Sequence, residues 1–142
     1  GSFDSVSSAD AGSDFGSTTF QLTSQPSGVS KEFTGFIKST RAGDVTFKIS
    51  SDDMSYMWIG PDAFDATDPE TSFINNGGEH GVVEKSATLP MGDDYVPFKI
   101  VYGNNAGGGS FTLTHDITTE GVFTSDMTGL FFRDFRKTNR GF

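Results

Sequence analysis

The sequence predicts an all-β fold, a sandwich or a barrel, on three observations. Apolar and polar residues alternate with a period of two in several segments, as they do around Val45, Phe47 and Ile49. The composition, with 18 Gly and 15 Phe in 142 residues, favours strands and tight turns over helices. Clusters of Gly, Pro, Asn and Asp separate the alternating segments. A chain of this length normally forms one domain.

The alternation places each expected strand in order along the chain. We expect strands near 18–23, 31–39, 44–49, 55–59, 81–89, 96–102, 110–114 and 129–135. Turns are expected at 25–28, 75–78 and 92–94, because these segments combine Pro, Asn, Asp and Gly. Only residues 61–68 could hold a helical turn. About eight short strands with regular turns are typical of a sandwich or barrel.

Composition divides the chain into three regions. Residues 1–17 are mostly Ser, Asp, Gly and Ala, so we expect a flexible or partner-ordered lead. Residues 18–132 carry the alternation and form the expected β domain. Residues 133–142 hold four basic residues and one acidic residue, a net charge of +3 out of a total of −9, and they interleave these charges with Phe. This tail is either a docking edge or a last strand with a solvated end.

The net charge and the absence of catalytic motifs make several classes of function unexpected. The chain outside the tail carries −12, which disfavours nucleic acid and anionic membranes and attracts cations. There is no cysteine and no apolar run of about 18 residues, so neither disulfides nor membrane insertion is expected. No GxSxG, P-loop or HExxH pattern is present, and we expect no enzyme.

Two segments carry oxygen atoms that suit a metal. Asp52 and Asp53 are adjacent between two expected strands, and both could reach one ion only where the backbone departs from extended geometry, as at a non-proline cis peptide. Residues 102–110 join two strands through asparagines and glycines, and calcium takes six to eight oxygens, including amide and backbone carbonyl oxygens. The alternatives are an acidic turn and a flexible hairpin loop. Together the two segments favour a calcium site.

The chain resembles the anthrax protective-antigen domain superfamily. The resemblance lies in two longer stretches that contain these segments, first FTGFIKSTRAGDVTFKISSDDMSYMWIG and then NNGGEHGVVEKSATLPMGDDYVPFKIVYGNNAGGGSFTL. That superfamily includes the lectin domains of yeast flocculins and GLEYA-type adhesins, and the chain looks most similar to versions from marine bacteria and their phages. The resemblance covers about residues 17–132. It implies an antiparallel β-sandwich whose exposed end binds calcium, with the ion coordinating sugar hydroxyls in the lectin members.

The resemblance also implies roles for individual residues. Asp52 and Asp53 match the paired aspartates of the family, and Asn104 matches the loop asparagine that ligates the ion. The carbonyls of Ala106 and Gly108 follow at alternate positions as further metal ligands. We expect Asp52, Asp53, Asn104 and Asn105 to form the ligand-binding site. The chain lacks the disulfides of the adhesins. Gly107 to Gly109 also replace bulkier loop residues that help select sugars in some members of the family, so the resemblance predicts calcium binding better than it predicts which sugar binds.

Other candidate residues have more ordinary interpretations. His80 and His115 lie in different segments without metal-binding spacing, and such histidines are more often hydrogen-bonded than ligating. Trp58 and Tyr56 could stack on sugar rings, although packing in the core is the more common role.

The leading hypothesis is a calcium-dependent carbohydrate-binding module of an adhesin or receptor-binding surface protein, located outside a cell or on a virion. Its partner is a glycan held through the bound calcium. The alternative is a structural subunit of a virion, tail or extracellular filament that contacts neighbouring copies through its termini. A targeting module attached to an enzyme is a third role. The glycan, the host and the oligomeric state do not follow from the sequence.

Overall fold

A computed structural model describes residues 21–38, 42–92, 94–105, 107–118, 120–127 and 130–133. The lead at 1–17 and the tail beyond Arg133 lie outside the described residues, as does the first part of the strand expected at 18–23. The described strands are β1 (Gln21–Gln25), β2 (Val29–Ile37), β3 (Gly43–Asp52), β4 (Met54–Ile59), β5 (Ile74–Asn76), β6 (Val83–Met91), β7 (Val96–Asn104), β8 (Gly109–Asp116) and β9 (Phe131–Arg133).

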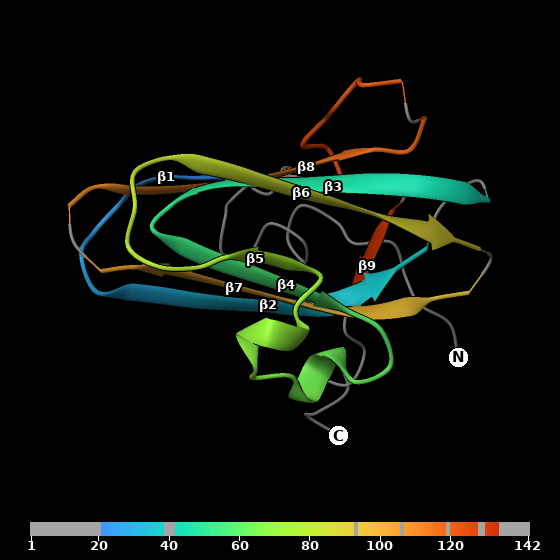
Figure 1. Ribbon diagram of the computed structural model, residues 1–142, viewed down its shortest axis with the longest axis horizontal. Coiled ribbons are helices and arrows are strands. Elements are labelled where there is room, and N and C mark those ends of the chain that lie inside the picture. The colour runs from blue at the N-terminus through green and yellow to red at the C-terminus, as the bar shows by residue number, and fades with distance from the viewer. Residues whose placement is uncertain are drawn as a thin grey trace.

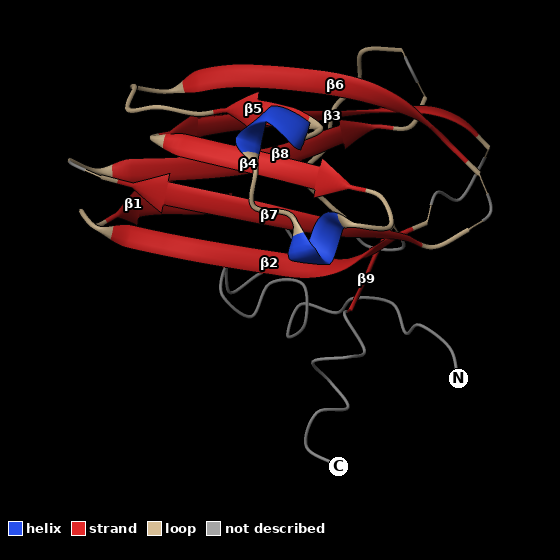
Figure 2. Ribbon diagram, turned by 60° about the horizontal axis from the view of Figure 1, so that its bottom comes forward, coloured by secondary structure: helices blue, strands red, loops and turns tan. Residues whose placement is uncertain are grey.

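The strands form two antiparallel sheets that pack face to face, so the predicted β-sandwich is confirmed (Figure 1). One sheet has the order β1-β8-β3-β6, and the other has the order β5-β4-β7-β2-β9 (Figure 2). The central strands β3 and β7 each pair along most of their length with two neighbours.

Two details differ from the sequence prediction. Residues Ile74–Asn76 form the short strand β5 beside β4, whereas we expected residues 75–78 to be only a turn. The asparagines obscured this strand because Asn is rare in strands. The expected helical turn at 61–68 is present as a 3₁₀ helix, η1 (Ala63–Asp65), and a second one, η2 (Pro69–Thr71), follows it. Asp68 caps η2 by accepting a hydrogen bond from the Glu70 amide.

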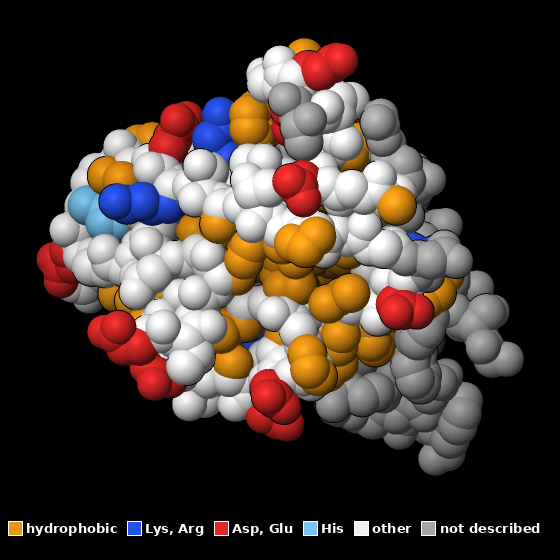
Figure 3. All heavy atoms as spheres, turned by 45° about the vertical axis from the view of Figure 1, so that its right-hand side comes forward, with side chains coloured by type: hydrophobic (Ala, Val, Ile, Leu, Met, Phe, Trp, Pro, Cys, Tyr) orange, Lys and Arg blue, Asp and Glu red, His pale blue; other side chains and the backbone are white. Residues whose placement is uncertain are grey.

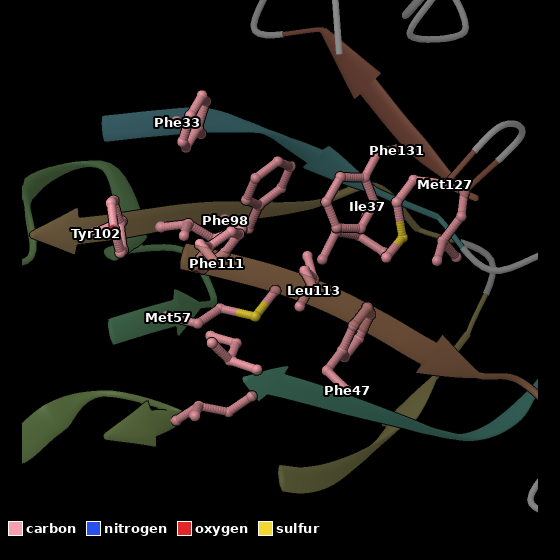
Figure 4. Close-up of a cluster of buried hydrophobic side chains, with 14 of the residues drawn as sticks. Phe33, Ile37, Phe47, Met57, Phe98, Tyr102, Phe111, Leu113, Met127 and Phe131 are labelled. Atoms are coloured by element: carbon pink, nitrogen blue, oxygen red, sulfur yellow. The ribbon is translucent and has the colours of Figure 1, made fainter. Parts of the chain in front are cut away.

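The core lies between the sheets and follows the alternation in the sequence. On β3, Val45, Phe47 and Ile49 are buried while the residues between them are half-buried. The row of β8 that contains Leu113 lies beside them in the same sheet, and the row of β7 that contains Ile100 belongs to the other sheet. Figure 4 shows Phe47, Leu113 and Phe98 among the side chains gathered between the layers. Aromatic rings meet in the middle, and the centroids of Phe98 and Phe131 lie 4.5 Å apart. This apolar interior stabilises the sandwich.

The surface combines partly covered apolar side chains with acidic ones. Figure 3 shows apolar side chains gathered on one face, with separate acidic side chains around them. Seven partly buried apolar residues pack against the core, namely Val29, Ile59, Phe73, Ala87, Leu89, Val96 and Ile117. Among the described residues, no helix has the length and apolar character needed to cross a membrane.

His115 is a buried polar residue at the end of β8. It is 6% exposed, and its ring lies 6.4 Å from that of Phe47. Its backbone pairs with Thr124, but its Nδ1 atom has no hydrogen-bond partner among the described residues. Burial lowers the pKa of His115 below its ordinary value of 6.5, although the charges of Asp116 and Asp126 act in the opposite direction.

The buried histidine predicts a loss of stability in mild acid. Because its folded-state pKa is depressed, its contribution to stability is complete above pH 6.5 and is lost as the pH falls through the folded-state pKa. Each unit of depression corresponds to about 1.4 kcal/mol. In urea unfolding at pH 7.5 and pH 5.5, His115→Gln should lose less stability over this interval than the wild type. An unchanged loss in His115→Gln would contradict this. The control is His80→Gln, which should lose at least as much stability as the wild type, because the pKa of His80 is raised in the folded state.

Candidate functional site

Four chain connections meet at one end of the sandwich, the left end in Figure 1. They join β1 to β2, β3 to β4, β5 to β6 and β7 to β8, and each passes from one sheet to the other. The crossing from β3 to β4 is made by a single residue, Asp53, because β3 ends at Asp52 and β4 begins at Met54. This end therefore contains most of the residues that the sequence nominated for metal binding.

The inward-facing rows of the strands become polar at this end. Of the eight buried polar residues in the described part of the chain, five lie here, namely Ser51, Asp53, Ser55, Asn76 and Asn104. All except Asp53, which lies in the crossing, continue a row of core residues by one step, as Ser51 continues Ile49 and as Asn104 continues Tyr102. The same faces that make the apolar core thus supply a polar layer above it. Buried polar groups need partners, so their contacts can be traced one by one.

The two aspartates have different environments. The peptide bond between them is cis. Asp53 is 5% exposed, and its carboxylate oxygens accept backbone hydrogen bonds from His80 at 3.1 Å and from Asn105 at 2.8 Å. Asp52 is half-buried, and its carbonyl oxygen accepts a hydrogen bond from the Tyr102 hydroxyl at 2.8 Å. Asp53 therefore connects three segments that are distant in sequence.

A buried polar network supports Asp53 from below. The Ser51 hydroxyl donates to the Asp53 carbonyl oxygen at 2.9 Å and lies 2.7 Å from the Ser55 hydroxyl. The side-chain amide of Asn76 donates to the Ser51 hydroxyl oxygen at 3.1 Å and to the Val83 carbonyl at 2.9 Å. These bonds hold the crossing between the two sheets in one geometry.

Hydrogen bonds from the amide nitrogen of Asn104 fix the orientation of its side chain. Asn104 is 2% exposed, and its Nδ2 atom donates to the carbonyl oxygens of Gln25 at 3.0 Å, Pro26 at 2.9 Å and Gly107 at 2.9 Å. Its Oδ1 atom is buried and has no hydrogen-bond partner among the described residues. Three acceptors around Nδ2 exclude the flipped amide, in which the oxygen would face three carbonyls. A buried acceptor oxygen remains open to a ligand.

Residue 109 has to be glycine, because the side chains of Asn104 and Tyr102 occupy the space that a side chain there would need. A Cβ atom at residue 109 would lie 2.6 Å from Cγ and 2.8 Å from Nδ2 of Asn104, and it would collide with the Tyr102 hydroxyl. Tyr102 is fully buried, and burial followed by the charges of Asp52 and Asp53 raises its pKa to about 12. The tyrosine therefore stays protonated and keeps donating to Asp52.

The connection between β5 and β6 lies against the segments that contain Asp53 and Asn105. The His80 ring has Nδ1 2.7 Å from the Gly81 carbonyl oxygen and Nε2 3.1 Å from the Asn76 carbonyl oxygen. Only the doubly protonated ring can donate to both. Burial lowers the pKa of His80, but these two carbonyls and the charges of Asp53 and Asp52 outweigh burial and raise it above 6.5. Glu79 accepts a hydrogen bond from the Asn105 side-chain amide.

The structure brings some of the nominated residues together and leaves others aside. The Asn105 amide donates to the Asp53 carboxylate, whereas the side chain of the adjacent Asn104 donates to backbone carbonyls of the two neighbouring connections. Gly108 lies exposed in the adjoining loop. Ala106 lies outside the described residues. Trp58 is 5% exposed and donates through Nε1 to the Asp68 carbonyl oxygen, so its role is in packing. No three His, Cys, Asp or Glu side chains of the described segments form a metal cluster by themselves, so amide and carbonyl oxygens would have to contribute.

Several groups that form the candidate site were not among the site residues predicted from the sequence. Ser51 and Tyr102 could have been identified, because they extend the alternating rows of β3 and β7 towards the aspartates. Glu79 and His80 had no comparable signal, since they follow a strand that was interpreted as a turn. The Gln25 and Pro26 carbonyls are backbone groups and leave no trace in the residue types.

Comparisons with known structures agree with this architecture. The A domain of epithelial adhesin 6 from Candida glabrata, solved with Galβ1-3GlcNAc, has 18% identity and a TM-score of 0.64 and shares 75% of this chain and 51% of its own. The PA14 sugar-binding domain of an RTX adhesin has 16% identity and a TM-score of 0.56, over 75% and 52% of the two chains. The PA14 domain of the antifreeze protein MpAFP has 13% identity and a TM-score of 0.58, over 73% and 51%.

At these identities the likeness concerns the fold, and this chain spans about half the length of each of these structures. No curated protein matches the sequence. The pattern of the GLEYA domain matches residues 29–117, from the start of β2 through the end of β8, and so includes the paired aspartates and the asparagine loop. With more than half of its length matched, the chain belongs to the GLEYA domain family.

Proposed function

We propose that this chain is a calcium-dependent carbohydrate-binding domain of a surface adhesin. The observation that carries the proposal is the open Oδ1 atom of Asn104, a buried acceptor whose neighbour in sequence, Asn105, is hydrogen-bonded to the Asp53 carboxylate. A hard cation such as calcium prefers oxygen ligands of this kind. The space kept by Gly109 is a second feature that fits an ion-binding loop.

The donor set matches calcium better than a transition metal. Asp52 and Asp53 would supply carboxylate oxygens, Asn104 an amide oxygen, and Ala106 and Gly108 backbone carbonyls. All of these are oxygen donors, whereas zinc and copper sites in proteins favour nitrogen and sulfur. When bound, calcium would supply direct coordination to sugar hydroxyls. The chain's own residues fix the position and charge of the site and leave its outer side open to a saccharide.

A binding role explains the site better than catalysis does. His80, the histidine beside the aspartates, uses both ring nitrogens on backbone carbonyls and so is not placed as a general base. Two of the similar structures are described as PA14 domains, which supports membership of the wider protective-antigen superfamily. Two are adhesin domains by name, which supports a location on a cell or particle surface. The alternative of a virion or filament subunit stays a prediction.

Calcium should stabilise the fold, because it binds residues that the folded chain alone brings together. At a hundredfold excess over the dissociation constant, the free energy of unfolding should rise by about 2.7 kcal/mol. The measurement is thermal unfolding in calcium and in chelator, with magnesium as the control ion. A melting temperature that is the same in calcium and in chelator would exclude the site.

Asp53→Asn should abolish both calcium binding and glycan binding, because it removes a charge from the centre of the site. It also changes two backbone contacts, so Asp52→Asn serves as a second variant at a half-buried position. The control is Asp44→Asn, an exposed aspartate near the opposite end of the same strand, β3. Isothermal titration with calcium and a glycan array test the three variants after circular dichroism has confirmed folding. Equal binding by Asp44→Asn and the two site variants would show that the wrong pair was assigned.

Gly109→Ala should weaken calcium binding, because the added methyl group displaces the Asn104 amide. Changes beside metal ligands typically lower affinity about 10- to 100-fold. Gly92→Ala is the control, since nothing lies within 4 Å of a Cβ atom at that position and the residue lies between β6 and β7, away from the site. The measurement is the calcium dissociation constant of each variant. Tight binding by Gly109→Ala would show that the orientation of Asn104 is not needed.

A further inference from the structure

The connection between β5 and β6 forms a wall of the proposed site that the sequence did not indicate. It is held by two contacts to different parts of the site. The His80 amide donates to the Asp53 carboxylate at 3.1 Å, and Glu79 accepts from the Asn105 side chain. Both partners belong to the segments proposed to hold calcium and sugar. Glu79 is exposed, so a ligand seated between these segments would meet its carboxylate.

Glu79 adds a third carboxylate to this end of the sandwich. A bound divalent cation would offset the charges of Asp52 and Asp53, and the charge of Glu79 would remain. The nearby cationic group is His80 when protonated, and its ring is turned to the carbonyls of Gly81 and Asn76. Lys85 is the next basic residue along the chain, two positions beyond the start of β6, and it is exposed. The exposed carboxylate at this rim, that of Glu79, thus has no basic side chain hydrogen-bonded to it among the described contacts.

Glu79 and Asn105 also present complementary polar groups. A carboxylate has two oxygens and about four acceptor sites, of which the Asn105 amide uses one. The remaining sites can accept hydrogen bonds from sugar hydroxyls, and hydrogen bonds to a charged acceptor are stronger than those between neutral groups. An anionic saccharide would instead bring a second carboxylate towards the first. Like charges at close range disfavour such a complex.

From this juxtaposition we infer that Glu79 is a specificity-determining residue that selects neutral saccharides over acidic ones. The inference rests on the proposed function, because it concerns the ligand held at that site. Glu79 accepts hydroxyl hydrogen bonds from a neutral sugar and repels a uronic acid. Asn105 holds the carboxylate in place between the two loops.

The experiment compares pairs of ligands that differ by one carboxylate. Methyl galactoside is paired with methyl galacturonide, and methyl glucoside with methyl glucuronide, in excess calcium at one pH. The proteins are the wild type, Glu79→Gln, which keeps the size and loses the charge, and Glu120→Gln. Glu120 is an exposed glutamate in the connection after β8, at the other end of the sandwich, so its replacement makes the same change in net charge.

The wild type should bind the neutral member of each bound pair more tightly. Glu79→Gln should reduce this preference by up to about fivefold, which is the range for an exposed charge interaction. Glu120→Gln should leave the preference unchanged. Raising the salt concentration should reduce the preference of the wild type and have little effect on Glu79→Gln, because salt screens exposed charges.

The outcomes separate this inference from the proposed function. If calcium titration shows no binding, or if no sugar binds the calcium-loaded wild type, the proposed function fails. If sugars bind and the preference is the same in the wild type and in Glu79→Gln, Glu79 does not determine specificity. If Glu120→Gln changes the preference as much as Glu79→Gln, the effect is one of net charge and the assignment to Glu79 is wrong. Direct calcium titration of Glu79→Gln confirms that the metal site is intact.

Discussion

The passage of the chain between two sheets at one end of the sandwich is the constraint on which the site depends. Each crossing interrupts a ladder of backbone hydrogen bonds while it is still close to the core, so the freed groups need partners that water cannot fully provide. The β3 to β4 crossing meets this need within one residue, because Asp53 accepts two backbone donors and its own carbonyl accepts from Ser51. The same hydrogen bonds therefore close this end of the core and position the residues of the candidate site.

Asn104 shows how this closure produces a binding group. Its amide nitrogen satisfies three carbonyls from two separate connections, which ties the β1 to β2 turn to the β7 to β8 loop. An amide that donates from one end must present its oxygen at the other, and here that end is buried. The fold thus fixes an acceptor oxygen without providing a donor from the described residues. Gly109 is needed because any side chain there would occupy the position of the amide.

The sequence predicted the layers of this structure well and the site in part. Period-two alternation located the central strands because their buried residues are apolar, as at Phe47 and Ile100. It failed at β5, where Asn75 and Asn76 resemble a turn although Asn76 is buried in the network below Asp53. The aspartates could be selected because their residue type suits calcium, and Asn104 was selected by the resemblance to the protective-antigen superfamily. Glu79 and His80 could not, since their proximity to Asp53 arises from strand pairing between β5 and β4 and not from spacing in the chain.

The division between core and crossings suggests how such a domain can change ligands without losing its fold. The inward-facing row of β3 changes from apolar to polar between Ile49 and Ser51, so the apolar core ends below the crossing and a polar network joins the sheets there. Asp53 and Asn104 are each constrained by several contacts, whereas Glu79 is exposed and its one assigned hydrogen bond is to another exposed side chain, that of Asn105. Substitutions at such a position alter the charge that a ligand meets and leave Asp53 and Asn104 in place. In the proposed site, selectivity can therefore change in the β5 to β6 connection while Asp53 and Asn104 stay the same.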